Sequence, residues 1–255
     1  TLLDTYLDDD SIAENNNIVY IDIEVDTEHS TSEPEDADNE ITAISFYTSL
    51  YDKKFIFILD KKNQVENKVI DNKYLYTYDN EEELLETFLK AYKKYMPTIL
   101  VGWNSEQYDI IYLCNRITKV LGEEYTADLS PIKIVKWDQR NHKYIIAGVS
   151  CLDYMILYKK FSINESASYT LDYICKSELG YGKVEYEGTL NDLYQNDINK
   201  FIEYNINDVE LIIDLEKKLQ YIDLAVEFCH DCHVPYEAIY SSSGPLEGAA
   251  LLFLK

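Results

Sequence analysis

The chain has 255 residues, which is long enough to bury a hydrophobic core in one large domain or one and a half. Its 23 Lys and Arg residues and 47 Asp and Glu residues give a formal net charge of −24. This charge argues against a free-standing nucleic-acid clamp, because binding to phosphates depends on basic surface. It still allows an enzyme that holds a nucleic acid locally through metal ions, aromatic rings and a basic partner domain.

Cysteine usage and hydropathy restrict the compartment. The five cysteines are an odd number without the spacing of a disulfide framework, which indicates a reducing compartment. No run of about 18 apolar residues is present, so we expect no membrane span. The chain starts at Thr1 without a signal peptide, and we expect it to be a piece of a longer protein.

Strands dominate the first part of the chain. A polar and acidic lead-in at residues 1–17 precedes an apolar strand at 18–25. Residues 26–40 combine many acids with Ser and Pro, which is typical of a mobile surface loop. Two stretches rich in Ile and Phe, 41–48 and 54–59, are expected to form a meander with the first strand.

A short strand, a helix and a buried strand follow. Residues 74–78 are expected to form the short strand. Asp79 or Asn80 then caps a helix that continues through Tyr95. Residues 98–102 are expected to form the buried strand, because they are a short, mostly apolar run.

Helices dominate the rest of the chain. A helix is expected from about 110 to 121, and the β-like stretches 132–137 and 143–149 predict a hairpin. Strands gathered early and helices gathered late predict an α/β or α+β domain with a mixed sheet. The further helical patterns cover residues 153–160, 169–179 and 197–231.

The first strand carries the clearest candidate for chemistry. Asp22 and Glu24 interrupt its apolar run at alternate positions, and residues two apart on a strand lie on the same face. Two neighbouring carboxylates repel each other and resist burial unless a cation lies between them. A divalent metal with oxygen ligands meets that need, and an edge strand with a solvated acidic face is the alternative for this segment alone.

Two later segments add acids to this pattern. Asp109 follows the strand-to-helix turn that contains Asn104, a place where side chains gather above the end of a sheet. Tyr204 and Asp208 stand four residues apart in the long helix and share one face. Taken alone, Asp109 is also explained as an N-cap and Asp208 as a solvated acid. With the first strand they make four carboxylates, enough to hold two metal ions for phosphodiester hydrolysis.

The order Asp-x-Glu, Asn-x4-Asp and Tyr-x3-Asp resembles the three exonuclease motifs of the DEDDy proofreading nucleases. The chain is similar to the exonuclease domain of family B replicative DNA polymerases of the T-even phage type, over most of residues 18–215. The segments that carry the resemblance are 20–25, Gly102-Trp103-Asn104 with Tyr108-Asp109, 113–122 (LCNRITKVLG), 148–161 (GVSCLDYMILYKKF), 168–174 and 204–210.

This resemblance implies a fold, an activity and roles for the acids. The fold would be α/β, a ribonuclease-H-like mixed sheet flanked by helices with an inserted β-hairpin. The activity would be metal-dependent 3′-to-5′ DNA exonuclease with two Mg²⁺ or Mn²⁺ ions. Asp22 would bridge both ions, Glu24 and Asp208 would hold the ion beside the attacking water, and Asp109 would hold the other. Tyr204 would position the water.

The resemblance also implies contacts with DNA. Residues 132–149 resemble the hairpin that keeps the primer strand apart during transfer to the nuclease site. Arg140 and His142 lie at its expected tip, among few basic groups nearby. Asn104 would support the strand end or touch the substrate. These three residues are therefore the candidates for DNA binding.

Domain boundaries and partners follow from the same likeness. Residues 1–17 would lead in from an upstream domain, 18–233 would be the exonuclease domain, and 234–255 would lead towards the polymerase N-terminal and palm regions. The expected partners are the single-stranded 3′ end of a DNA primer and the rest of the polymerase chain, with no membrane and no haem. A viral replication protein of this kind would act in the cytoplasm of an infected bacterial cell.

Three other interpretations remain. Cys229, Cys232 and His233 have the formal spacing of c-type haem attachment and offer zinc ligands, although the acids beside them favour ordinary packed or surface residues. A non-catalytic scaffold with a degenerate nuclease fold is the second, and an RNA-trimming DEDDy nuclease is the third. The four acids and Tyr204 favour catalysis, because a scaffold has no need for carboxylates that repel each other. The hairpin favours DNA over RNA.

Overall fold

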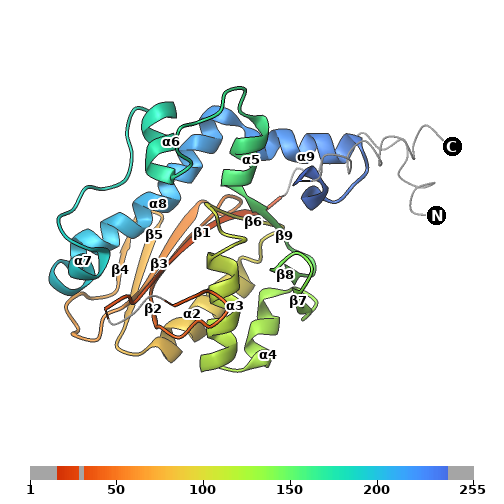
Figure 1. Cartoon of the computed structure of the whole chain (residues 1–255). Coiled ribbons are helices and arrows are strands. Elements are labelled where there is room, and N and C mark those ends of the chain that lie inside the picture. The colour runs from red at the N-terminus through yellow and green to blue at the C-terminus, as the bar shows by residue number, and fades with distance from the viewer. Residues whose placement is uncertain (1–15, 29–31, 241–255) are drawn as a thin grey trace.

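A computed structural model describes residues 16–28 and 32–240, with helices and strands labelled as in Figure 1. Most of the expected lead-in and the final segment 241–255 lie outside the described residues. The centre of the fold is a seven-stranded mixed sheet in the order β4-β5-β3-β2-β1-β6-β9. Its strands are β1 (Ile18–Val25), β2 (Ile41–Thr48), β3 (Lys53–Leu59), β4 (Lys68–Ile70), β5 (Lys73–Tyr78), β6 (Ile99–Gly102) and β9 (Ser150–Asp153).

The first three strands form the expected antiparallel meander, since β1 pairs with β2 and β2 with β3. Parallel pairs extend the sheet in both directions, with β6 and β9 beyond β1 and β5 beyond β3. The expected mixed sheet flanked by helices is therefore confirmed. Antiparallel neighbours need only a short turn, whereas the parallel ones are reached through crossovers such as the helix between β5 and β6.

Alternation along β1 divides the core into two layers. Val19, Ile21 and Ile23 point to the layer covered by α2 (Glu81–Lys94) and α3 (Asp109–Val120). Tyr20 points to the opposite layer, which α8 (Ile198–Leu219) crosses. Figure 1 shows α8 on one side of the sheet and α2 and α3 on the other.

The start of α2 illustrates how local chemistry sets an element. Asn80 accepts a hydrogen bond from the Glu83 backbone N–H at 2.9 Å, which satisfies one of the free donors at the helix N-terminus. The sequence had left Asp79 and Asn80 as alternatives, and the structure assigns the cap to Asn80. Acids follow in the first turn and Lys93 and Lys94 lie in the last, as the helix dipole favours.

The remaining elements surround this sheet. The expected hairpin is present as β7 (Val135–Asp138) and β8 (Lys143–Ile146), a separate antiparallel pair. It is fixed to the rest of the fold because Tyr144 donates a hydrogen bond to the Asn115 side chain of α3 at 2.6 Å. The other helices are α4 (Glu123–Thr126), α5 (Tyr154–Phe161), α6 (Leu171–Glu178), α7 (Leu190–Asn196) and α9 (Tyr221–Asp231), with 3-10 turns η1 (Ala127–Leu129) and η2 (Tyr236–Tyr240).

Two sequence expectations were wrong in detail. The expected strand 143–149 ends at Ile146, residues 147–149 form a turn, and β9 then begins at Ser150 on the edge of the main sheet. The expected helix 197–231 is two helices, which meet at Gln220 in the left-handed conformation with φ 54°. The Glu216 carboxylate stabilises this break, because it accepts hydrogen bonds from the first backbone N–H groups of α9, including that of Ile222 at 3.0 Å.

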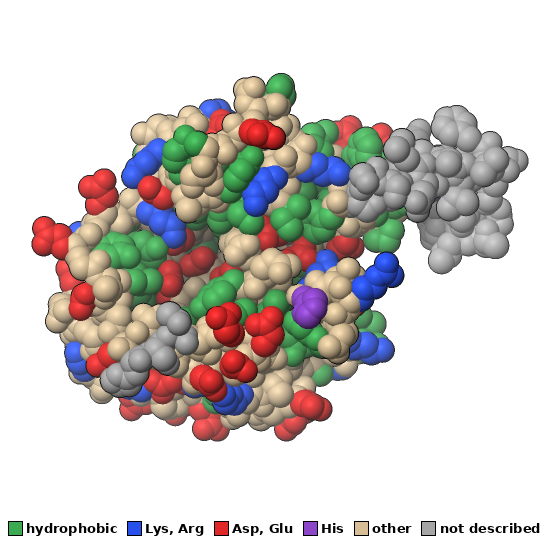
Figure 2. Space-filling model, viewed as in Figure 1, with side chains coloured by type: hydrophobic (Ala, Val, Ile, Leu, Met, Phe, Trp, Pro, Cys, Tyr) green, Lys and Arg blue, Asp and Glu red, His purple; other side chains and the backbone are tan. Residues whose placement is uncertain are grey.

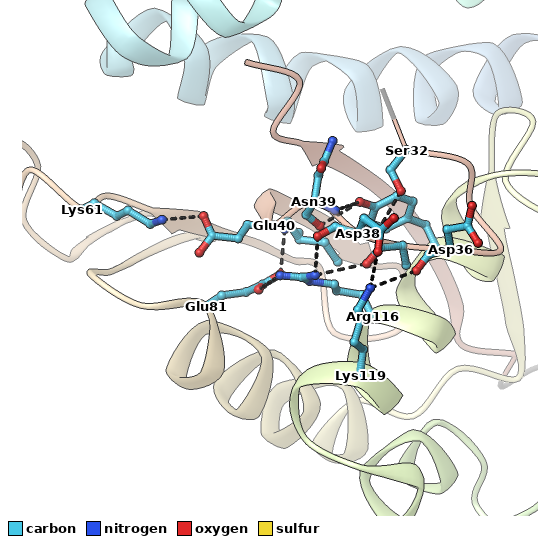
Figure 3. A network of polar contacts seen from close by, with 12 residues as sticks. Ser32, Asp36, Asp38, Asn39, Glu40, Lys61, Glu81, Arg116 and Lys119 are labelled. Atoms are coloured by element: carbon cyan, nitrogen blue, oxygen red, sulfur yellow. Dashed lines mark hydrogen bonds and ion pairs between the residues drawn. The ribbon is translucent and has the colours of Figure 1, made fainter. Parts of the chain in front are cut away.

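Residues 32–40 are part of the expected mobile loop 26–40, but one face of α3 holds them in place (Figure 3). The Arg116 guanidinium donates to the backbone carbonyls of Ala37 and Asp38 at 3.1 and 2.9 Å. It also forms a two-point contact with the Glu81 carboxylate at 2.8 and 2.6 Å. Further along α3, the Lys119 ammonium pairs with Asp38. This segment is therefore bound to α3, and Arg116 links it to Glu81 of α2.

The described chain continues past the expected boundary at residue 233. Ile239 is buried in the same core as α9, and the Tyr240 hydroxyl accepts a hydrogen bond from the backbone N–H of Asp153 in β9. The boundary between 233 and 234 stays a prediction. None of the helices in the described ranges combines the length and apolar character required to cross a bilayer.

Candidate active site

Three acids from two elements converge on one side of the sheet. Asp22 and Glu24 project from β1, and Asp208 projects from α8 above it. One carboxylate oxygen from each lies within 4.8 Å of the others, and this is the one group of three potential metal ligands of its kind in the described residues. Figure 2 shows acidic side chains inside a hollow that crosses this face of the molecule.

The strand geometry explains why β1 carries two of these acids. Parallel pairing between β1 and β6 ends at Tyr20 and Val101, so the two strands separate just before Asp22. Gly102 lies at this separation, and a Cβ added there would come within 2.8 Å of the Ile21 carbonyl oxygen. Only glycine fits without a shift of the backbone. The chain then turns away from β1 and leaves one edge of the strand free.

Asp109 fills that edge. It is the first residue of α3, and its carboxylate accepts a hydrogen bond from the Ile23 backbone N–H at 3.1 Å. The N–H thus lies between the two acidic residues of β1. The N-cap of α3 is Tyr108, so the structure does not support the N-cap explanation for Asp109. Asp109 is buried next to the cluster but is not one of the three acids whose oxygens meet.

Lys183 belongs to this site and was missed by sequence analysis. Its ammonium donates to the Asp208 carboxylate at 2.6 Å and to the Tyr204 hydroxyl at 2.9 Å. It comes from the connection between α6 and α7, where its backbone N–H donates to Asp172 at 2.9 Å. No periodicity marks this connection, and the one available signal was the general need for a cation beside acids that repel each other.

The site makes ionisation of its acids unfavourable. Burial, followed by the charges of Asp208 and Glu24, raises the pKa of Asp22 well above its usual range. Burial and the charge of Asp208 raise the pKa of Glu24 to about 8. Burial raises the pKa of Asp109 to about 7, even though its hydrogen bond from Ile23 opposes the shift.

Lys183 only partly compensates this charge. Burial raises the pKa of Asp208 despite the ion pair with Lys183. Burial lowers the pKa of Lys183, but Asp208, Tyr204 and Asp22 outweigh this effect and hold its pKa above the ordinary value. One ammonium thus faces several carboxylates, so the acids favour additional positive charge.

The donor atoms match a hard divalent cation. Asp22 Oδ2 and Asp208 Oδ1 are buried and have no hydrogen-bond partner among the described residues. Buried polar atoms are nearly always satisfied in native proteins, and two such exceptions within one group of three acids are what a cation site without its cation would leave. The cluster offers oxygen ligands alone, which suits Mg²⁺ or Mn²⁺ better than metals that prefer sulfur or imidazole.

The DNA-binding candidates lie in two turns, one after β6 and one between β7 and β8. Asn104 lies in the turn after β6 with φ 60°, a left-handed conformation that Asn tolerates, and its backbone N–H donates to Asp153 at 3.0 Å. This turn conformation explains why an Asn stands at position 104 without any contact with substrate. Arg140 and His142 are exposed in the loop between β7 and β8, at the expected hairpin tip. Their contact with DNA stays a prediction.

The cysteine motif near the C-terminus has a packing explanation. Cys229 is buried in α9, and its thiol donates to the Tyr236 backbone carbonyl at 3.6 Å. The His230 and His233 rings stack at 6.2 Å between centroids. Within residues 16–28 and 32–240, no three of these Cys, His and acidic side chains bring their ligand atoms together.

Comparison with known proteins gives a consistent result. The family model described as DNA polymerase family B, exonuclease domain, matches residues 4–174. The DNA-directed DNA polymerase of Escherichia phage RB69 is 32% identical over 251 residues, which cover 88% of this chain and 28% of that protein. The corresponding enzyme of Enterobacteria phage T4 is 31% identical over 247 residues, covering 86% and 27%. This chain therefore spans little more than a quarter of these polymerases.

Proposed function

The chain belongs to the exonuclease domain of family B DNA polymerases, and from this premise we propose that it is a proofreading 3′-to-5′ exonuclease. It would hydrolyse the phosphodiester bond at the single-stranded 3′ end of a DNA primer. The observation that carries the proposal is the convergence of Asp22, Glu24 and Asp208, two of which retain buried oxygens that no residue in the described part of the chain satisfies.

The family depends on divalent metal in general, and the acidic cluster is suited to hold it. We assign two Mg²⁺ or Mn²⁺ ions to the site. Asp22 would bridge the two ions, Glu24 and Asp208 would hold one, and Asp109 would hold the other. When bound, a pair of divalent ions supplies Lewis-acid stabilisation of the attacking and leaving oxygens in phosphoryl displacement.

Tyr204 and Lys183 have supporting parts in this proposal. Tyr204 lies one helical turn before Asp208, and its phenol is close enough to accept a hydrogen bond from Lys183. A phenol held in this way can orient a water molecule towards the phosphate. Lys183 keeps the phenol in place and reduces the repulsion among the acids. The edge-to-face contact of Tyr204 with Tyr186, at 5.4 Å between ring centroids, restricts the ring further.

The remaining parts of the proposal concern the partners. A net charge of −24 makes this chain a poor binder of DNA backbone by itself. The other domains of a polymerase would therefore supply most of the basic surface, while Arg140 and His142 would contact the primer strand and Asn104 would support the strand end or touch the substrate. The phage relatives support a viral replication protein acting in the cytoplasm of an infected bacterium.

The alternatives explain less of the molecule. A non-catalytic scaffold would have no reason to retain several buried acids facing a single ammonium, because their repulsion only lowers stability. An RNA-trimming nuclease would account for the acids but not for the likeness to DNA polymerases.

A direct assay tests the proposal. The chain is incubated with end-labelled single-stranded DNA, with Mg²⁺ or Mn²⁺ and then with excess chelator. We expect a ladder of single-nucleotide steps from the 3′ end that disappears with the chelator. Cleavage that starts at the 5′ end or survives chelation would contradict the proposal. Faster digestion of an RNA strand of the same sequence would favour the RNA-trimming alternative, and no digestion in the intact polymerase would favour the scaffold.

A further inference from the structure

A buried serine hydroxyl lies unsatisfied beside the acidic cluster. Ser45 is in the middle of β2, is 0% exposed, and its Oγ has no hydrogen-bond partner among the residues that the structure describes. A strand position of this kind favours an apolar or β-branched side chain, because a buried hydroxyl without a partner lowers stability. The flanking residues on the same face, Ala43 and Tyr47, provide no explanation for it.

The strand register places this hydroxyl opposite Asp22. Ser45 and Asp22 are direct partners in the antiparallel pair of β1 and β2. Such partners project to the same face, with Cβ atoms about 4.5–5.5 Å apart. On its other side Ser45 is paired with Ile56, which has no polar side-chain atom. Asp22 Oδ2 is itself buried without a partner, so an unused donor lies beside an unused acceptor.

We propose that Ser45 is a positioning residue for the metal site, and that its hydroxyl donates a hydrogen bond to the Asp22 carboxylate when Asp22 holds a divalent cation. The inference rests on the proposed function of the cluster. A carboxylate that bridges ions must present its lone pairs in fixed directions, and a donor on one oxygen restricts its rotation. Carboxylate ligands of metals are commonly hydrogen-bonded in this way by residues that never touch the metal.

The same geometry explains why the hydroxyl is unpaired in the metal-free chain. Rotation about χ1 of a serine moves only its Oγ, so the donor can turn towards Asp22 without displacing the strand. Asp22 has no other side-chain donor opposite it in β2. The hydroxyl would therefore lower the stability of the metal-free protein slightly and contribute only when the ligand is bound.

Metal binding, measured apart from cleavage, tests this role. Mn²⁺ is titrated by calorimetry into the metal-free protein carrying Ser45→Ala, Ser45→Cys or Ser45→Thr. We expect Ser45→Ala to weaken Mn²⁺ binding about tenfold, as is typical for loss of a hydrogen bond to a metal ligand. Ser45→Cys keeps the volume but is a weak donor and should behave like Ser45→Ala. Ser45→Thr keeps the hydroxyl and should recover most of the affinity.

Thr48→Val is the matched control on the same strand. The Thr48 hydroxyl is also 0% exposed, but it is satisfied by Asn17 Oδ1 at 2.7 Å. Thr48→Val should lower the thermal midpoint of the metal-free protein and leave Mn²⁺ affinity unchanged. Ser45→Ala should weaken Mn²⁺ binding without lowering that thermal midpoint. Wild-type affinity in Ser45→Ala would overturn the proposal. A fall in its metal-free midpoint equal to that of Thr48→Val would overturn it too, because the hydroxyl would then have a structural partner.

The proposed function can fail separately. Asp22→Ala should remove the tight Mn²⁺ site, whatever the role of Ser45. If Mn²⁺ binding survives Asp22→Ala, the acidic cluster is not the metal centre and the proposed function is wrong. If Asp22→Ala abolishes binding while Ser45→Ala has no effect, the metal centre stands and only the role of Ser45 is excluded.

Discussion

Two acid-rich regions lie close to the end of β1, and they differ in how their charge is compensated. The segment 32–40 is held by cations, with Arg116 joining its backbone to Glu81 and Lys119 and Lys61 paired with its side chains (Figure 3). In the candidate active site the described residues bring one ammonium, that of Lys183, into contact with one carboxylate, that of Asp208, while the other acids of the cluster lie beside this pair.

The comparison shows which acids indicate a ligand. Both regions are rich in Asp and Glu, so acid content alone does not distinguish them. The segment 32–40 is held through satisfied contacts, whereas the active-site oxygens Asp22 Oδ2 and Asp208 Oδ1 have no partner within residues 16–28 and 32–240. Acids that remain unpaired in a folded chain lower its stability, and they are expected where something outside the chain completes them.

The largest expected effect on cleavage distinguishes the acids of the candidate active site from those of the segment 32–40. Asp22→Ala should lower the rate of cleavage by at least ~10³-fold, which corresponds to about 4 kcal/mol of activation free energy. The thermal midpoint of the metal-free protein should be unchanged or higher, because repulsion with Glu24 and Asp208 is removed. The measurements are single-turnover cleavage with saturating Mg²⁺ and thermal unfolding in chelator.

Asp38→Ala is the matched control from the anchored segment. Its side chain is 66% exposed and pairs with Lys119, so the variant should cleave DNA at close to the wild-type rate. Normal cleavage by Asp22→Ala would refute the assignment of Asp22. An equal loss in both variants would mean that total acid charge matters more than the geometry of the cluster.

A second prediction concerns the cation of the anchored region. Arg116→Met should lower the free energy of unfolding by about 3 kcal/mol, because it removes the cation that pairs with the buried Glu81 carboxylate and donates to two backbone carbonyls. Denaturant unfolding measures this loss. Adding Glu81→Leu to Arg116→Met removes the unpaired charge and should recover part of the stability, whereas a further loss in the double variant would show that the ion pair is not the source.

Tyr204→Phe should have a smaller effect on cleavage than any change of the four acids. The phenol orients water in the proposed mechanism but does not neutralise metal charge, so a loss of about tenfold is expected, near 1.4 kcal/mol. Mn²⁺ affinity should remain that of the wild type, and calorimetry alongside single-turnover cleavage separates the two quantities. A loss as large as that of Asp208→Ala would assign Tyr204 a structural role.

The sequence was sufficient for the acids that follow from periodicity. Alternation on a strand placed Asp22 and Glu24 on one face, and helical spacing placed Tyr204 and Asp208 together. Lys183 was missed because its position depends on how an irregular connection folds back over α8, which no local pattern encodes. The catalytic roles of the acids and of Tyr204 stay predictions.

Strand register and backbone conformation are the other features that sequence alone could not predict. The pairing of Ser45 with Asp22 depends on strand register, which sequence alone does not give for two strands separated by a long loop. The break between α8 and α9 was missed because Gln220 is neither Gly nor Pro. It is stabilised instead by Glu216, a residue that sequence alone assigns to the helix interior.

The smallest expected effect on DNA digestion concerns two basic side chains that are exposed, whereas Arg116 is buried. Arg140 and His142 lie at the hairpin tip, where we expect them to separate the primer from its template. Single-stranded DNA already has a free end, whereas a duplex end must be opened at a cost of about 1.4 kcal/mol for each base-pair step. Arg140→Ala with His142→Asn should therefore slow digestion of duplex primers about fivefold in the intact polymerase and leave single strands nearly unaffected.

Asn suits position 142 because the backbone there has φ 48°. Lys136→Ala removes one exposed charge from the hairpin stem and serves as the control. Equal losses on both substrates would show that the tip residues bind phosphate without separating strands, because only strand separation distinguishes a paired end from a free one.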